Sequence, residues 1–162
     1  MLNLDMDKNA EKAKRIVLEN QYMAVATSDG NNPWSSPLYY SVDEFFNFYF
    51  VTSYKSRHSK NLRVNPRIAL SIYNSTLPPD KVDGVQIEGT ANKVSILEFP
   101  KAALFYFRKR FGDPKKRKKS ILELSKYSGI GLHRLYKIIP THVYTLASSH
   151  QNADKRVEVF LS

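Results

Sequence analysis

The chain has 162 residues, of which 42% are hydrophobic and 12% aromatic, and a formal net charge of +10. This composition predicts a single folded domain over 1–162 with a sizeable core, and the charge favours anionic partners. The absence of cysteine excludes disulfides and thiolate chemistry, and the four histidines show no metal-ligand spacing, so we expect no metal. No apolar run could span a bilayer and the N-terminus is charged, which favours a cytoplasmic protein without a membrane partner.

The first half of the chain alternates a helical pattern with strand patterns. Residues 7–21 have apolar positions at helical spacing, which predicts an N-terminal amphipathic helix. The segment Tyr22 to Ser28 is a predicted strand, followed by turn residues at 29–32. The segments Trp34 to Val42 and Phe46 to Thr52 are rich in β-forming residues. We expect these three strands to form an antiparallel meander.

A short helix and two further strands follow. Ser56 is a good N-cap, and Pro66 disfavours helical geometry in the residue before it. The segments Ile68 to Tyr73 and Gly84 to Val94 are predicted strands, the second with period-two alternation. Gly89 inside that strand indicates a bulge or a tight bend.

The next region is helical and strongly basic. Residues 96–111 suit a helix with Pro100 in its first turn, and residues 121–126 suit a second, short helix. Between them, residues 113–119 include the run KKRKK. A solvated loop and a nucleic-acid patch share this composition, and we favour the loop.

The C-terminal part returns to strand patterns. Leu132 to Ile139 and His142 to Ala147 are predicted as two strands with Pro140 between them. The polar tail over 148–162 contains RVEVFL, which could form an edge strand. The pattern predicts a mainly β (α+β) fold, an antiparallel six- or seven-stranded barrel with peripheral helices and no domain boundary.

The segment FVTSYKSRHSKNLRVNP has the composition of an anion site. It places a hydroxyl and several basic side chains between the end of a strand and the start of a helix. A helix start exposes unpaired N–H groups and a partial positive charge, which suits a phosphate. A solvated basic turn that only caps the helix would have the same residues, so spacing alone leaves both interpretations open.

A family resemblance extends this interpretation. The order of AVATSDGNNPWSSPLYYSV, FYFVTSYKSRHSKNLRVNPRIALSIY and GVQIEGTANKV resembles the pyridoxamine 5′-phosphate oxidase-like split-barrel family, and HRLYKIIPTHVYTLA resembles the closing strands of its smaller members. The resemblance covers most of the chain. It implies a split β-barrel that binds FMN in a groove completed by the second subunit of a homodimer.

The resemblance also implies which residues bind the cofactor. Ser36 to Tyr39 match the strand whose backbone lies against the flavin ring, and Arg57 matches a phosphate-binding arginine. His58 stands where relatives carry lysine, so Lys60 could supply that charge, and Gln86 lies on the strand that reaches the flavin of the other subunit. The full set of candidates is Ser36, Pro37, Leu38, Tyr39, Val51, Thr52, Ser56, Arg57, His58, Lys60 and Gln86.

The implied function is that of an FMN-dependent oxidoreductase acting on a small molecule. The tail lacks the tryptophan and the Arg-His-Arg cluster of true pyridoxamine-phosphate oxidases, which argues against pyridoxal phosphate synthesis and leaves the substrate open. No catalytic residue is assigned, because the flavin would carry the chemistry. Two alternatives remain: a module of this fold that holds haem or a deazaflavin, and a basic nucleic-acid binder.

The nucleic-acid alternative depends on a dense aromatic group. Its members, which could stack on bases, are Trp34, Tyr39, Tyr40, Phe46, Phe48 and Tyr49. Most of them alternate within predicted strands, which favours positions in the barrel core or in a dimer interface. Nucleic acid is therefore the less favoured partner.

Overall fold

A computed structural model describes residues 2–81, 83–127, 132–147 and 155–161 of the chain. Within these ranges, eight strands form one antiparallel sheet in the order β2-β1-β5-β6-β7-β4-β3, with β8 beside β7. The strands are β1 (Tyr22–Ser28), β2 (Pro33–Tyr39), β3 (Ser41–Val42), β4 (Phe48–Ser53), β5 (Arg67–Tyr73), β6 (Gly84–Lys93), β7 (His133–Leu146) and β8 (Arg156–Glu158).

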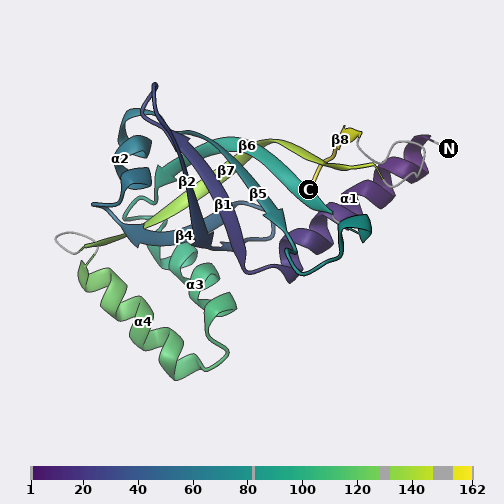
Figure 1. The fold of residues 1–162 in the computed structure, drawn as a ribbon. Coiled ribbons are helices and arrows are strands. Elements are labelled where there is room, and N and C mark those ends of the chain that lie inside the picture. The colour runs from purple at the N-terminus through teal and green to yellow at the C-terminus, as the bar shows by residue number, and fades with distance from the viewer. Residues whose placement is uncertain (1, 82, 128–131, 148–154, 162) are drawn as a thin grey trace.

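The sheet curls into a barrel, as Figure 1 shows. Six of the described strands have six or more residues, while β3 and β8 have two and three. The predicted antiparallel split barrel with peripheral helices is confirmed. The helices are α1 (Leu2–Glu19), α2 (Arg57–Val64), α3 (Phe99–Arg110) and α4 (Pro114–Tyr127).

The predicted meander of the first strands is confirmed in its two hairpins, β1–β2 and β3–β4, but the second predicted strand is divided at Tyr40 and β2 does not pair with β4. β2 pairs with β1 and forms one edge of the sheet, whereas β4 pairs with β3 and β7 near the opposite edge. Tyr40 lies between β2 and β3, and its side chain is fully buried in the barrel core. The short turn after Val42 forms the expected hairpin, with Ser41 paired to Tyr49 and Val42 to Phe48. One edge of β2 is left without a strand neighbour among the described residues.

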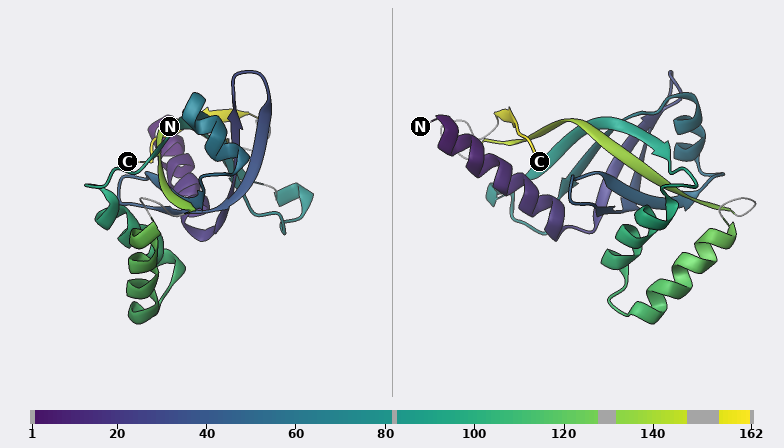
Figure 2. Two further views of the ribbon diagram at one scale, coloured as in Figure 1. Left: turned by 90° about the vertical axis from the view of Figure 1, so that its left-hand side faces the viewer. Right: turned by 180° about the vertical axis from the view of Figure 1, so that it is seen from behind.

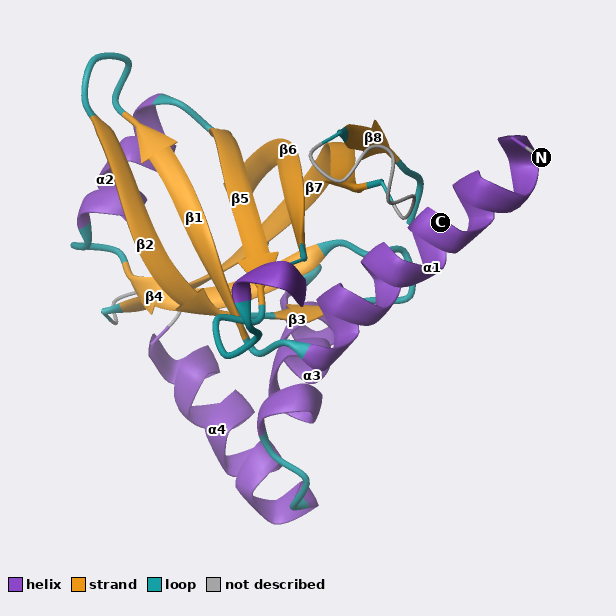
Figure 3. Cartoon of the chain, turned by 45° about the vertical axis from the view of Figure 1, so that its right-hand side comes forward, coloured by secondary structure: helices purple, strands orange, loops and turns teal. Residues whose placement is uncertain are grey.

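The helices lie at the ends and on one side of the barrel. α1 lies at one end, α2 lies at the other beside β1 and β2, and α3 and α4 form a hairpin that projects from the sheet (Figures 2 and 3). α1 turns Asn9, Ala13 and Val17 inward at a spacing of four residues, as its amphipathic pattern predicts. No helix in the described part of the chain is long and apolar enough to cross a membrane.

The basic segment 113–119 is not a loop. α4 begins at Pro114, seven residues before the predicted start, and includes the whole KKRKK run. Asp113 caps it, because its carboxylate accepts from the N–H of Lys115 at 2.8 Å. Lysine and arginine are good helix formers and proline is favoured in the first turn, so charge density alone was a poor indicator of a loop.

Two apolar clusters form the core. The larger fills the barrel and includes Tyr40, Phe48 and Phe50, and the smaller lies between the sheet and α3 and includes Tyr49 and Tyr106. The aromatic residues assigned to the core are therefore mostly buried. Trp34 differs, because 41% of its surface is exposed.

The closing strand is continuous. The two predicted strands after residue 132 form the single strand β7, which runs through Pro140, and RVEVFL contributes β8 beside it, as predicted. Pro140 lies opposite Gly89, where the β6–β7 register shifts, which confirms the predicted bulge. A Cβ atom at Gly89 would lie 2.5 Å from the carbonyl oxygen of Ile139. Glycine therefore permits the close approach of the two backbones that accommodates a proline inside the sheet.

Candidate functional site

Ser56 shapes the start of α2. It is the N-cap, with its hydroxyl accepting from the N–H of Ser59 at 3.3 Å and lying 2.8 Å from the carbonyl of Ser53. The amides of Arg57 and His58 come before that of Ser59 and have no acceptor within the helix. The predicted cap is confirmed. Its hydroxyl is engaged in the turn itself, so the contribution of Ser56 to an anion site is to fix the direction of these amides.

Arg57 and Lys60 are exposed cations in the first turn of α2, and Lys55 is exposed just before the N-cap. The guanidinium of Arg57 stacks on Trp34 of β2, with its carbon 4.5 Å from the ring centroid. The pKa of Asp29 in the β1–β2 turn is lowered mainly by the backbone N–H groups of Asn32 and Asn31. The charge of Arg57 makes a smaller contribution. Stacking occupies the face of the guanidinium and leaves its N–H edge for an anion.

His58 points into the protein. Its Nδ1 lies 2.9 Å from the hydroxyl of Ser36 on β2, and its Nε2 lies 2.7 Å from the hydroxyl of Thr52 on β4. All three side chains are buried, and burial lowers the pKa of His58. The ring is therefore neutral at neutral pH and bridges β2, α2 and β4. It does not provide the positive charge that a lysine at this position would carry.

The remaining candidates on β2 and β4 flank this bridge. Pro37 is exposed at the β2 edge, Leu38 and Tyr39 are half-buried, and Val51 is half-buried on β4. The Tyr39 ring packs edge-on against Tyr106 of α3. The backbone of residues 36–39 thus runs along the open edge of the sheet and begins beside the start of α2.

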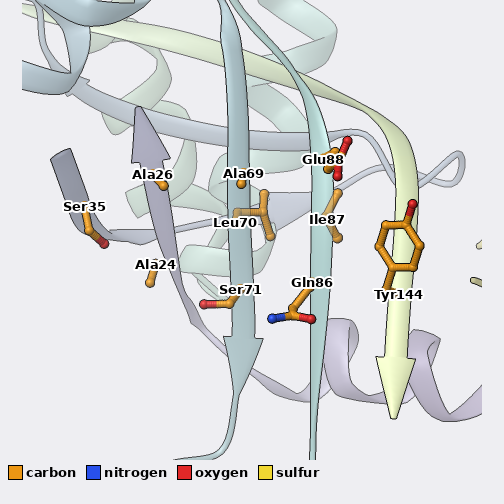
Figure 4. Close-up of a pocket in the computed structure, with 10 residues that line it drawn as sticks. All are labelled: Ala24, Ala26, Ser35, Ala69, Leu70, Ser71, Gln86, Ile87, Glu88 and Tyr144. Carbon is orange, nitrogen blue, oxygen red and sulfur yellow. The ribbon is translucent and has the colours of Figure 1, made fainter. Parts of the chain in front are cut away.

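A shallow groove of about 400 Å³ crosses the outer face of the sheet (Figure 4). Its floor consists of small side chains in register: Ala26 lies between Ser35 and Ala69, and Ala24 lies beside Ser71. Longer polar side chains of β6 and β7 form the far wall, as Figure 4 shows for Gln86, Glu88 and Tyr144. A floor of alanine and serine allows a flat ring or a second sheet to approach closely.

Gln86 lies on the far wall of this groove. It accepts from Nε of Arg156 at 2.6 Å and pairs with Ser71 on β5. β6 is three strands away from β2, which corresponds to about 14 Å at the usual strand spacing. Within one chain, Gln86 is therefore not brought to the start of α2.

Sequence reasoning missed several residues of this region. Trp34 was assigned to the core or an interface, although it carries the stacked Arg57. The small outward positions of β1 and β5 were also missed, although alternation in YMAVATS and RIALSIY placed alanine and serine on one face. Within the described residues, no cluster of three or more histidine or acidic side chains could hold a metal.

Comparison with known proteins relates the whole fold to a family. The family model described as pyridoxamine 5′-phosphate oxidase matches residues 10–147. UPF0306 protein PM1958 of Pasteurella multocida is 31% identical over 97 residues, which are 57% of this chain and 65% of the relative. The pyridoxine/pyridoxamine 5′-phosphate oxidase of Vesicomyosocius okutanii is 33% identical over 103 residues, which are 64% of this chain and 44% of the relative.

Solved structures agree with the sequence comparison. A haem-binding protein from Mycobacterium smegmatis has a TM-score of 0.69 at 16% identity, covering 94% of this chain and 57% of that one. This likeness shows the fold alone. The matches span less than two thirds of each of these relatives. The family model, by contrast, covers most of this sequence, so the chain belongs to the pyridoxamine 5′-phosphate oxidase family.

Proposed function

We propose that this chain is an FMN-binding flavoprotein and an oxidoreductase for a small molecule. The observation that carries the proposal is the start of α2, where Arg57 and Lys60 are exposed beside two outward amides and the open edge of β2. Cations and a helix start together favour a phosphate dianion. The neighbouring strand edge offers peptide donors and acceptors to a flat heterocycle.

The residues present fit the phosphate end of FMN through the cations Arg57 and Lys60. Arg57 would donate through its N–H edge while it remains stacked on Trp34, and Lys60 would add a second positive charge. His58 would act indirectly, because its bonds to Ser36 and Thr52 hold β2 and β4 in place on either side of the helix start. It is a positioning residue in this proposal.

The bound flavin would supply the hydride or electron transfer. The chain would bind the phosphate, orient the ring along the backbone of residues 36–39 and exclude water from one face. This division of tasks requires no side chain as general acid or base.

We propose in addition that the chain works as a homodimer. The small-residue groove on the outer face of the sheet could accept a second copy, because alanine and serine allow close approach. A second copy would also bring its own Gln86 to the flavin bound at the start of α2 in the first. FMN would then stabilise the dimer, since one chain offers only part of the site.

A second candidate ligand is haem, and His142 favours it. This imidazole is exposed on the outer face of β7, opposite Glu88 in the ladder, and Glu158 holds its Nδ1 at 2.7 Å. A carboxylate on one ring nitrogen is the usual companion of a histidine that binds metal through the other. The fold is shared with a haem-binding protein, which supports this alternative.

The absorption spectrum of the purified protein distinguishes these candidates. The proposal predicts an oxidised-flavin spectrum, either as purified or after loading with FMN and removal of free cofactor, at one flavin per chain. A haem spectrum that is lost in His142→Ala would favour the second candidate. A nucleic-acid spectrum with no retained flavin would contradict both.

A further inference from the structure

A second cavity is lined by residues of α2, β6 and β7 and by Tyr54, which follows β4. Its volume is about 450 Å³. The buried side chains of Leu62, Ala91 and Tyr136 belong to the barrel core and line it from inside. The cavity is therefore an open mouth of the barrel with an apolar floor.

Three cations from three different elements surround this mouth. Arg63 comes from α2, Lys93 from β6 and Arg134 from β7. Arg63 donates to the carbonyl of Tyr54 at 2.9 Å, and the guanidinium of Arg134 lies 5.2 Å from the centroid of the Tyr54 ring. Lys93 lies opposite Tyr136 in the β6–β7 ladder.

Among the described residues that line the mouth, every charged side chain is a cation. Besides the three cations and the floor, the described lining consists of Tyr54 and Asn92, and it contains no acidic side chain. Like charges at a low-dielectric cavity repel one another and concentrate counter-ions there. An anion would relieve this repulsion, and an apolar body attached to it would cover the floor.

The mouth is separate from the proposed flavin site. Its lining shares no residue with the groove on the outer face of the sheet. Arg63 lies at the C-terminal end of α2, whereas Arg57 lies at its start and stacks on β2, which contributes nothing to the described lining.

We propose that the barrel mouth is a second binding site. Its ligand is a small flat anion, in which an aromatic or aliphatic body carries a carboxylate, sulfonate or phosphate group. The body lies on Leu62, Ala91 and Tyr136, and the anionic group meets Lys93, Arg63 and Arg134. Arginine and lysine at the rim form charge-assisted hydrogen bonds with such a group.

The test uses a matched pair of probes. 8-Anilinonaphthalene-1-sulfonate is an aromatic anion, and N-phenyl-1-naphthylamine has the same rings without the charge. The double variant Lys93→Gln/Arg134→Gln removes two rim cations and leaves the floor. The control Arg117→Gln/Lys118→Gln removes the same charge from another apolar groove, of about 420 Å³, between α3 and α4. Calorimetry measures binding, and circular dichroism with the unfolding midpoint establishes that each variant is folded.

The expected result is that the dissociation constant of the sulfonate rises about tenfold or more in the mouth variant, the scale of a lost charge-assisted hydrogen bond. It should change less than about twofold in the control, and the uncharged probe should bind all three proteins alike. If the double variant does not fold, Lys93→Glu, at an exposed position, should give the same direction. Equal affinity of the wild type and the mouth variant for the sulfonate would overturn the proposal. An equal loss of sulfonate affinity in the control variant would also overturn it.

Competition between FMN and the sulfonate probe distinguishes a failure of this inference from a failure of the proposed function. Saturating FMN should leave sulfonate binding intact, and the mouth variant should keep wild-type FMN affinity. Displacement of the sulfonate by FMN would mean that one site serves both and would overturn the inference. If the chain binds no FMN at all, the comparison of the two probes still decides whether the mouth binds anions.

Discussion

Arg57 on α2 and Trp34 on β2 are stacked, with the guanidinium carbon 4.5 Å from the indole centroid. Trp34 is the only tryptophan in the 162-residue sequence. The emission of this single indole therefore reports on the residue at the centre of the proposed phosphate site.

The first prediction concerns Arg57→Gln. Loss of the charge-assisted bonds to phosphate should weaken FMN binding by ~1.5 kcal/mol or more, about tenfold. Removal of the cation should also change the emission of Trp34 before any ligand is added. The control is Arg63→Gln, which removes the same charge from the other end of the helix and should leave both readouts near their wild-type values. Unchanged FMN affinity in Arg57→Gln at low salt would show that Arg57 is only a solvated turn residue.

A second prediction follows from the buried His58. Burial lowers its pKa in the folded state, so the unfolded chain binds the extra proton more readily. Its contribution to stability is therefore present in full above the unfolded value of about 6.5 and is lost as the pH falls from there through the folded pKa. The free energy of unfolding of the wild type should decrease across this window more steeply than that of His58→Gln.

The same variant tests the bridge directly. Loss of the bonds to Ser36 and Thr52 should lower the stability of His58→Gln at pH 8 by ~1–3 kcal/mol in urea unfolding. The pair His142–Glu158 is present in both proteins, so its opposite pH dependence cancels in the difference. Parallel pH profiles of the two proteins would contradict a buried neutral His58.

Much of this fold could be predicted from the sequence because its signals are local. The cap at Ser56, the turn at Asp29 and the bulge at Gly89 depend on a few adjacent residues, and the structure has all three. The division of the second predicted strand could not be predicted in this way. The turn between Val42 and Phe48 is the hairpin that its residues indicate, yet the strand before it is divided at the buried Tyr40, so that β2 forms one edge of the sheet and β4 lies next to the other edge.

The same distinction between local signals and long-range contacts applies to the candidate site. Local sequence placed Arg57 and Lys60 at a helix start, where the structure also has them exposed. The inward turn of His58 depends on hydroxyls 22 and 6 residues away in sequence, and nothing in the segment itself indicates that contact. The three cations at the barrel mouth come from α2, β6 and β7, so no sequence window contains them together.

A third prediction concerns Gly89. A Cβ atom there would lie 2.5 Å from a backbone oxygen, so Gly89→Ala must displace β7 near Pro140 and should lower stability by ~1–3 kcal/mol. Gly112→Ala is the matched control, because a Cβ atom at that position would have nothing within 4 Å. Its unfolding free energy should stay within ~0.5 kcal/mol of the wild type. Equal stability of the two variants would show that the sheet adjusts freely at the bulge.

A fourth prediction tests the proposed dimer. Ala69 is exposed on the floor of the outer groove, where Ala69→Arg would project a long charged side chain toward a second copy. Sedimentation should show a dimer for the wild type, stabilised by FMN, and a monomer for Ala69→Arg with weakened flavin binding. Leu122→Arg on α4 alters an exposed residue far from the groove and should leave the dimer intact. A dimer with full flavin in Ala69→Arg would place the subunit contact elsewhere.

The proposed function depends most directly on binding of the FMN phosphate at the start of α2. Titrations of the wild-type protein with FMN and with riboflavin, followed through the emission of Trp34, test it directly because the two flavins differ only in the phosphate. FMN should bind at least about tenfold more tightly than riboflavin, and added salt should reduce the difference between the two dissociation constants. Equal dissociation constants for the two flavins would contradict it.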